Sequence, residues 1–283
     1  MKAQITPCLW FDNQAKEAAA LYCSVFANAK ITSESHIVTE IAIAGRKFTL
    51  LDGGPMYKPN PSISFYYVCE NEQELDRIWK AFSAKGMVMM PLDKYPWSEK
   101  YGWVADAYGV SWQLALGKLS DVGQKVTPFL TFTGKDYGRA EEAIEHYTNV
   151  FKNVKVDGIL RYGANEKPDQ EGMVKHAQFA INGNKFMVSE SAAPHAFSFG
   201  EGVSFTVYCE SQEEIDYFWD KLTESGEESM CGWLKDRFGV SWQIIPAVLG
   251  QIMSDPSKAG KAAKAFLSMR KLNIEQIVQA TMA

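Results

Sequence analysis

The stretch CGWLKDRFGVSWQIIP, from Cys231 to Pro246, has a close counterpart earlier in the chain: YGWVADAYGVSWQLAL, from Tyr101 to Leu116. The pattern G-W-x-x-D-x-[YF]-G-V-S-W-Q is kept without a gap. In both copies an Asp opens and a Gly closes a short segment between two strand-like runs. This arrangement predicts a tight hairpin with the Gly in the left-handed region. Aromatic strand positions usually belong to a core, so we expect four buried tryptophans: Trp103, Trp112, Trp233 and Trp242.

Other segments repeat in the same order, which indicates a duplicated unit and not an isolated motif. The matching pairs are ITPCLWF (5–11) with VTPFLTF (126–132), IAGRKFTL (43–50) with INGNKFMV (181–188), and SFYYVCENEQELDRIW (64–79) with SFTVYCESQEEIDYFW (204–219). A stretch with helical spacing of apolar residues follows the first segment in each half. The duplicated unit therefore spans roughly 5–118 and 126–246.

Each half divides again into two modules of strand, helix and three strands. In the second module, Asn71 is the expected N-cap of a helix over 72–85, and Glu74 completes a capping box. The apolar stripe of this helix is Leu75, Ile78, Trp79 and Phe82. The chain thus predicts an α+β fold of four βαβββ modules. We expect a first domain over 1–120, a second over 121–246, and a helical extension over 247–283 that has no counterpart.

Segments without a counterpart break the symmetry of the repeat. Residues 91–100 occur only in the first half and residues 163–172 only in the second; both are polar, contain Pro and are interpreted as loops. The first of them carries Tyr95 and Trp97, and is either a lid over a cavity or a surface or inter-domain contact. In the extension, Asp255-Pro256 predicts a helix start, and Asn273 with Gln276 predicts another capped start.

Composition excludes several classes of protein. A formal net charge of -5 and a pI of about 5.5 argue against a nucleic-acid-binding surface, which needs clustered Lys and Arg. No apolar run is long enough to span a membrane, and the first residues do not resemble a signal peptide. The cysteines are odd in number and scattered, without a C-x-x-C pair: Cys8, Cys23, Cys69, Cys209 and Cys231. We therefore expect a reduced, cytoplasmic protein with no membrane or nucleic-acid partner.

The repeated residues carry a resemblance to a known family. The opening T-P-x-L-x-F, the W-F-D before the first helix, the GGP at 53–55 and CGWLKDRFGVSWQIIP resemble the PhnB-like branch of the vicinal oxygen chelate superfamily. The resemblance covers nearly the whole chain, twice over. It implies paired βαβββ modules that form two half-open barrels around small-molecule cavities, as in glyoxalase and bleomycin-resistance proteins. Two such domains in one chain would form an intramolecular pseudo-dimer; a homodimer is the other arrangement we expect.

Members of this branch are often labelled 3-demethylubiquinone-9 3-methyltransferase. A typical methyltransferase holds its nucleotide-like cofactor at a Gly-rich turn between a strand and a helix. The chain offers LDGGP (51–55), with no G-x-G-x-x-G and no helical pattern after it. The residues therefore argue against a methyltransferase of that kind and predict no cofactor.

The resemblance also implies where a metal would bind, because metal-dependent members hold a divalent cation with His, Glu or Gln on their strands. The expected His positions fall near Ile5, Val126, Ser62 or Ser64, and Gly202 or Ser204; the expected Glu positions are Gln113 and Gln243. A lone amide is a poor anchor for a cation. His36 and His176 lie in predicted strands, and we interpret them, like His146 and His195, as structural or surface residues. The sequence predicts no metal.

What remains is an aromatic cavity in each half, with one amide in its wall. The candidate ligand-binding residues are Trp10, Phe65, Tyr67, Trp112 and Gln113 in the first half, and Phe205, Trp242 and Gln243 in the second. Such walls suit a flat or apolar small molecule; the alternative is that these residues fill the barrels. We therefore expect a metal-free small-molecule-binding protein. The alternatives are a metal-dependent lyase, isomerase or dioxygenase that uses Gln113 or Gln243 with His36 or His176, and an interaction scaffold with filled cavities.

Overall fold

The computed structural model describes residues 4–282. Contacts within the chain divide it into two compact units. One comprises residues 7–203, and the other comprises residues 204–282 with the beginning of the first strand, residues 4–6. The boundary of the sequence repeat, near residue 120, lies inside the first of these units.

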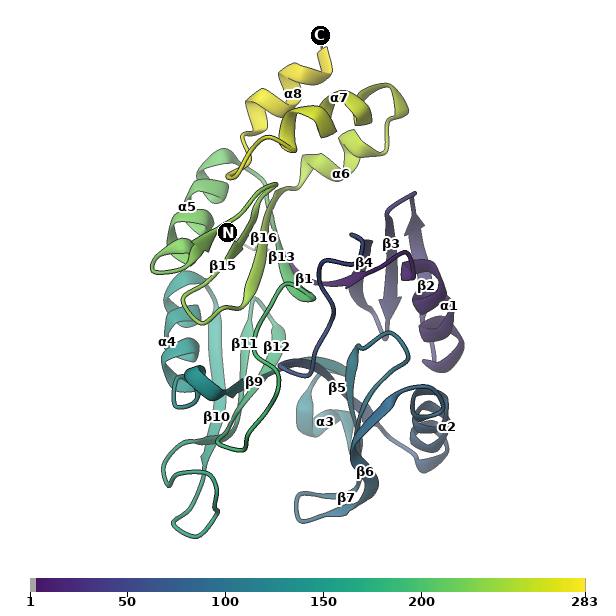
Figure 1. The fold of residues 1–283 in the computed structure, drawn as a ribbon, viewed down its shortest axis with the longest axis vertical. Coiled ribbons are helices and arrows are strands. Elements are labelled where there is room, and N and C mark those ends of the chain that lie inside the picture. Colours follow the sequence, from purple (N-terminus) through teal and green to yellow (C-terminus); the bar gives the residue numbers. More distant parts are fainter. Residues whose placement is uncertain (1–3, 283) are drawn as a thin grey trace. The chain divides into compact units, whose positions relative to one another are not determined.

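The chain runs through four modules of strand, helix and three strands, as the repeat predicts (Figure 1). The first module is β1 (Gln4–Phe11), α1 (Ala15–Val25), β2 (Lys30–Glu34), β3 (Val38–Ile43) and β4 (Arg46–Asp52). The second is β5 (Ile63–Cys69), α2 (Glu72–Ser83), β6 (Met87–Tyr95), β7 (Ser98–Ala105) and β8 (Ser111–Leu116). A short helix, α3 (Leu119–Val122), connects the halves.

The second half repeats this order. Its first module is β9 (Val126–Thr133), the 3-10 turn η1 (Gly134–Asp136), α4 (Ala140–Val150), β10 (Val154–Arg161), β11 (Val174–Ile181) and β12 (Asn184–Ser191). Its second is β13 (Val203–Cys209), α5 (Gln212–Thr223), β14 (Glu227–Glu228), β15 (Trp233–Lys235) and β16 (Ser241–Pro246). Three helices follow: α6 (Val248–Met253), α7 (Pro256–Phe266) and α8 (Ile274–Met282). The α+β prediction of four βαβββ modules with C-terminal helices is confirmed.

An eight-stranded mixed sheet lies in the unit of residues 7–203. Its strand order is β10-β11-β12-β9-β5-β8-β7-β6, so it is an open sheet with β10 and β6 at its edges. The two central strands come from different halves of the repeat: β5 pairs antiparallel with β9 and parallel with β8. The same unit holds the strands β1-β4-β3-β2, and the other unit holds β14-β15-β16-β13. The open sheets agree with the half-open barrels that the resemblance implies.

Helices α2 and α4 pack on one face of the eight-stranded sheet. Side chains alternate between faces along a strand, and on β5 the positions Phe65 and Tyr67 turn toward the helices while Ser64 and Tyr66 turn away. The approach of α2 is close: a Cβ on Gly102 would lie 2.4 Å from the ring of Trp79. Figure 1 shows α4 beside β11 and β12, the strands that it contacts.

The repeated motif builds a buried carboxylate at the turn between β7 and β8. Oδ1 of Asp106 accepts hydrogen bonds from the backbone N–H of Tyr108 (2.9 Å) and of Val110 (3.1 Å). Oδ2 accepts from the Trp112 indole (3.0 Å) and from the Tyr22 hydroxyl on α1 (2.7 Å). Burial raises the pKa of the Asp106 carboxyl. One side chain thus closes the hairpin, orients the buried Trp and ties down a helix from the preceding module.

The second copy builds the same turn. Oδ1 of Asp236 accepts from the backbone N–H of Phe238 and of Val240, at 2.9 and 3.0 Å, and Oδ2 accepts from the Trp242 indole at 2.9 Å. The closing glycines, Gly109 and Gly239, have φ of 85° and 86°, as the hairpin prediction requires. The spacing from Asp to Trp in the motif therefore brings the carboxylate within hydrogen-bond distance of two backbone N–H groups and of the Trp indole.

Some expectations need correction. Trp112 and Trp242 are buried, but the expectation of buried side chains is wrong for Trp103 and Trp233, which are half-buried because they lie on the opposite face of the hairpin. Residues 91–100 are not a loop: they extend β6 and β7 into a long hairpin. His36 lies in an exposed bend and not in a strand.

Other local predictions are confirmed. Asn71 caps α2 by accepting from the Glu74 backbone N–H at 2.8 Å. Asp255 caps α7 with Pro256 in its first turn, and the Asn273 side chain accepts from the Gln276 N–H at 2.9 Å. The segment 163–172 is a loop between β10 and β11.

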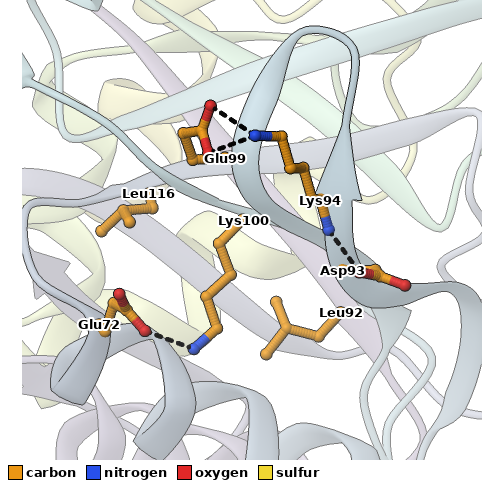
Figure 2. Close-up of a pocket in the computed structure, with 7 residues that line it drawn as sticks. All are labelled: Glu72, Leu92, Asp93, Lys94, Glu99, Lys100 and Leu116. Atoms are coloured by element: carbon orange, nitrogen blue, oxygen red, sulfur yellow. Dashed lines mark hydrogen bonds and ion pairs between the residues drawn. The ribbon is translucent and has the colours of Figure 1, made fainter.

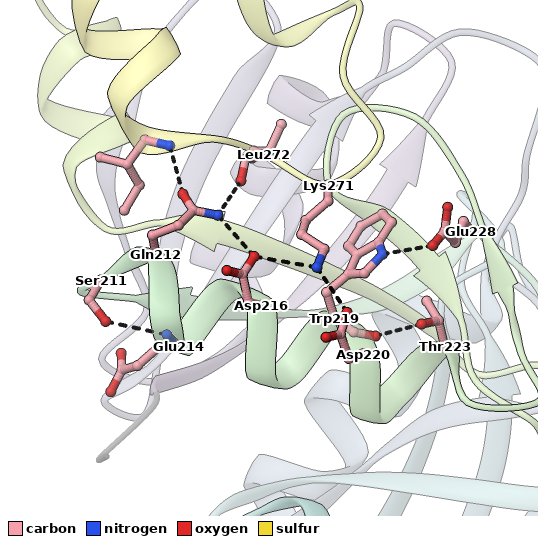
Figure 3. A network of polar contacts seen from close by, with 11 residues as sticks. Ser211, Gln212, Glu214, Asp216, Trp219, Asp220, Thr223, Glu228, Lys271 and Leu272 are labelled. Atoms are coloured by element: carbon pink, nitrogen blue, oxygen red, sulfur yellow. Dashed lines mark hydrogen bonds and ion pairs between the residues drawn. The ribbon is translucent and has the colours of Figure 1, made fainter.

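The C-terminal helices α6, α7 and α8 pack together around a small apolar core of their own (Figure 1). Its buried members are Leu249, Ile252, Ala262, Leu272 and Ile277. Figure 3 shows how polar contacts fasten this extension to α5. The Gln212 amide donates to the Leu272 carbonyl (3.1 Å) and accepts from the Ile274 N–H (2.9 Å), while the Lys271 ammonium bridges Asp216 and Asp220 at 3.3 and 2.8 Å.

We predict that Asp106→Ala lowers the free energy of unfolding by about 3–5 kcal/mol, because it leaves several buried donors without an acceptor. Urea unfolding followed by tryptophan fluorescence measures this loss. Asp121→Ala, at an exposed aspartate in α3, is the matched control and should change stability by less than about 0.5 kcal/mol. A loss below about 1 kcal/mol for the Asp106 variant would contradict the role given to the carboxylate.

We predict that Gln212→Ala loosens the C-terminal extension by about 1–2 kcal/mol while leaving the sheets intact, because two backbone groups lose their partner. Hydrogen exchange should show roughly tenfold faster exchange for the amides of α8. Gln251→Ala, at an exposed position of α6, serves as the control. Equal protection of α8 in both variants would show that the amide does not hold the extension.

Candidate functional site

The face of the eight-stranded sheet that lies opposite α2 and α4, here called the inner face, gathers the polar and aromatic side chains of its central strands. Strand register places on it, among others, Ser64, Tyr66, Tyr101, Trp103, Ser111, Gln113, Thr127, Phe129, Thr131, His176, Gln178, Met187 and Ser189. They come from both halves of the repeat. Most carry a neutral hydrogen-bonding group. Lys185 of β12 has the same parity as Met187 and Ser189, and its ammonium is paired with Asp157.

Gln113 lies at the centre of a neutral hydrogen-bond network on the inner face. Its Nε2 donates to Ser64 Oγ at 2.8 Å, and its Oε1 accepts from the Tyr101 hydroxyl at 2.8 Å. Burial raises the pKa of Tyr101, so this hydroxyl remains a donor. These two bonds fix the orientation of the amide. Trp103 is held similarly, since its indole donates to Ser111 Oγ at 2.7 Å.

An aromatic cluster from the β6–β7 hairpin adjoins this network. Tyr95 and Trp97 stack at 5.1 Å between ring centroids, and both meet Tyr101 edge-on, at 5.6 and 5.8 Å. Trp97 is 60% exposed, which is high for such a large apolar side chain. Because Tyr101 also binds Gln113, the hairpin that only the first half possesses is in direct contact with the amide network.

The other end of the inner face carries the imidazole of His176. Its ring lies 5.6 Å from that of Phe129, and burial lowers the pKa of His176, so the neutral imidazole is favoured. Its neighbour Gln178 donates to Asp157 (3.1 Å), whose carboxylate also pairs with Lys185. These ion pairs hold the pKa of Asp157 at about 2 and neutralise the charges at this edge.

The structure separates the residues proposed from sequence as a cavity wall. Phe65, Tyr67 and Trp112 are fully buried on the helix side. Trp112 contacts Tyr22 of α1, and both Trp112 and Tyr67 contact Phe26 at the end of that helix, while Phe65 packs on Trp112. Trp10 lies on β1, where its indole donates to the Gly54 carbonyl at 2.7 Å and its ring meets Tyr57 at 5.0 Å. Of the first-half candidates, only Gln113 lies on the inner face.

The second-half candidates repeat this pattern. Phe205 and Trp242 are buried ring against ring, 5.4 Å apart, while Gln243 donates to Ser204 Oγ at 2.9 Å. Sequence reasoning did not identify Tyr66, Tyr101, Phe129, Thr131 and Ser189 as members of the inner face. Once the order of the strands is known, these residues can be found by starting at Gln113 and following the alternation of side chains from each strand to the next.

Four of the positions at which the resemblance implies metal ligands are occupied by hydrogen-bonded neutral pairs. Ser64 with Gln113, and Ser204 with Gln243, stand where a His and a Glu are implied. Among residues 4–282, no group of three or more His, Cys, Asp or Glu side chains is spaced to hold a metal ion. In the first half the amide oxygen of Gln113 is also engaged, because it accepts from the Tyr101 hydroxyl.

Cys69 and Cys209 are not suited to act as nucleophiles. Both are buried, and burial raises the pKa of each thiol to about 12, so the reactive thiolate does not form near neutral pH. Cys69 and Cys209 are therefore small apolar residues of the core.

A pocket of about 330 Å³ opens beside the N-terminus of α2, away from the inner face (Figure 2). Lys100 and Lys94 line it with three carboxylates, and both are already paired. Lys100 binds Glu72 at 3.0 Å and Asp76 at 2.7 Å, and Lys94 binds Glu99 at 2.8 Å. These internal ion pairs leave little net charge to attract a ligand, so the pocket is a surface salt-bridge cluster.

Within residues 4–282, no helix has the length and apolar character needed to cross a bilayer.

Comparisons with known proteins agree with this architecture. A family model described as 3-demethylubiquinone-9 3-methyltransferase matches residues 3–115 and again 124–245. A PhnB protein from Bacillus cereus is 34% identical over 40% of this chain and 98% of its own, with a TM-score of 0.39. Glyoxalase I from Zea mays aligns over 90% of this chain and 97% of its own, with a TM-score of 0.58 and 9% identity. No curated protein matches the chain.

We predict that His176→Phe flattens the dependence of stability on pH. Since the pKa of His176 is lowered in the folded chain, protonation favours the unfolded chain. Stability should therefore fall as pH drops from about 7.5 through the ordinary histidine range to about 5.5. The variant should lose part of this fall in melting temperature, whereas His36→Gln, at an exposed histidine, should keep all of it. Identical profiles for the His176 variant and the unmodified chain would contradict the assignment.

Proposed function

The chain belongs to the 3-demethylubiquinone-9 3-methyltransferase family, whose model matches both of its halves, and from this premise we propose that it binds a small planar molecule on the inner face without a metal. The family shares its fold with glyoxalase I, so the residues of the site, and not the fold, have to supply the function. The observation that carries the proposal is the neutral network of Ser64, Gln113 and Tyr101.

This network suits recognition better than chemistry. It offers one fixed amide N–H beside aromatic rings, an arrangement that orients a flat ligand through few polar contacts. The nearby imidazole of His176 is neutral and lies four strands from Gln113 in the order β8-β5-β9-β12-β11. The set contains no carboxylate that would act as a general acid or base beside the amide.

Methyl transfer from a nucleotide-like cofactor finds little support in this arrangement. Enzymes of that kind usually place helices on both faces of a parallel sheet and hold the cofactor at a Gly-rich strand–helix turn. Here both large helices of the eight-stranded sheet pack on one face, and its central strands are mixed in direction. We propose that the ligand binds on the inner face and not at a Gly-rich turn between a strand and a helix.

We also propose a cytoplasmic location. All five cysteines are free thiols, which suits a reducing compartment.

The proposal predicts that aromatic and quinone-like compounds in a thermal-shift screen raise the melting temperature, because a ligand that binds only the folded chain stabilises it. For a compound that does so, Gln113→Ala should weaken binding about tenfold, the cost of one hydrogen bond of about 1.4 kcal/mol. Calorimetric titration measures the change. Gln73→Ala, at an exposed position of α2, should leave the affinity unchanged.

Two results would each support one of the alternative functions. A stoichiometric divalent metal, found by elemental analysis of protein purified without chelator, would favour a metal-dependent lyase, isomerase or dioxygenase with an unusual ligand set. A screen in which no compound shifts the melting temperature would favour an interaction scaffold, whose inner face is filled by the chain's own side chains.

A further inference from the structure

Arg46 has an unusual environment at the start of β4. It directly follows the turn of Ala44 and Gly45, whose φ values are 48° and 81°. The three guanidinium nitrogens are buried, and none makes a hydrogen bond with any group of the described chain, residues 4–282. The residue as a whole is partly exposed. Long basic side chains usually keep the charged end in water, whereas the charged end of Arg46 is buried.

The guanidinium ends a column of stacked aromatic rings on the helix side of the eight-stranded sheet. Its Cζ lies 5.7 Å from the ring centroid of Phe186. Phe186 stacks on Phe179 at 5.6 Å and 17°, and Phe179 stacks on Tyr147 of α4 at 6.3 Å and 19°. A cation–π contact engages the face of the aromatic ring and provides no hydrogen-bond acceptor for the five N–H donors of the guanidinium.

Burial without an acceptor is costly for a permanent charge. Desolvation lowers the pKa of Arg46 to about 10, and no neighbouring carboxylate offsets this effect. A charge buried in a protein normally has an opposite charge beside it. The aromatic column provides the guanidinium only with the cation–π attraction of the Phe186 ring.

The sequence repeat indicates that the hairpin itself does not need this charge. In IAGRKFTL and INGNKFMV, the position of Arg46 is taken by Asn184. There the side-chain amide donates to the Ile181 carbonyl at 3.4 Å, within its own turn. The same hairpin therefore forms around a neutral residue, and the arginine in the first half calls for a separate explanation.

We propose that Arg46 binds a small oxyanion, a carboxylate or a phosphate group, against the edge of the aromatic column. The planar fork of the guanidinium matches two oxygens of such a group at once. The turn that precedes it, Ala44 and Gly45, is exposed to solvent. This site lies on the helix side of the sheet and is separate from the inner face proposed for the planar ligand.

Thermal unfolding of the full chain tests the proposal in phosphate, sulfate, acetate and chloride at constant ionic strength. Phosphate or acetate should raise the melting temperature above its value in chloride by roughly 3–6 °C at about ten times the dissociation constant. The difference between the phosphate and acetate arms identifies which oxyanion binds. No rise with any of them up to about 50 mM would overturn the proposal.

Arg46→Asn gives the first hairpin the residue that the second already has at this position, and it should abolish the rise. Lys47→Gln removes a charge from the exposed neighbouring position and should keep it. If the Asn variant does not fold, Arg46→Lys takes its place. It keeps the charge, loses the planar fork, and should retain less than about half of the rise. A full rise in either Arg46 variant would overturn the proposal.

Discussion

The buried carboxylate of Asp106 is the interaction on which the packing of the first half depends. It joins three elements that are distant in sequence: helix α1 through Tyr22, the β7–β8 turn through two backbone amides, and the core through Trp112. Phe26 and Phe82 then pack on the indole that the carboxylate has oriented. A charge placed in a core in this way specifies geometry more than it adds stability, because burial opposes its ionisation.

The fold could be predicted because the sequence patterns that mark its turns, helices and strands occur in both copies of the repeat. The cap at Asn71, the hairpin glycines and the strand–helix order all depend on neighbours in the sequence. The pairing of β5 with β9 could not be anticipated, since it joins residues on either side of the repeat boundary and has no local signature. The same reason explains the hairpin of residues 91–100: Pro91 suggested a loop, yet it lies in β6, an edge strand where a missing backbone N–H is tolerated.

The candidate site could be anticipated only in part. The motif singles out Gln113, but parity alone does not say which face of a strand meets the helices. The sequence predicts Phe65, Tyr67 and Trp112 in a cavity wall, but they lie on the helix side of the sheet because the helices need the larger apolar area. The smaller polar side chains at the alternate positions, Ser64 and Ser111, are the ones left for the inner face. Which face receives the helices is decided by tertiary packing.

The central position of β5 and β9 also bears on how a duplicated gene can diverge. Each copy contributes half of one continuous hydrogen-bonded sheet, so neither copy can be discarded without exposing the edge of a strand that is now interior. The pair is thereby locked together, while each member remains free to acquire its own surface features. The long hairpin before Tyr101 and the arginine at position 46 are two features of the first copy that the second copy does not have.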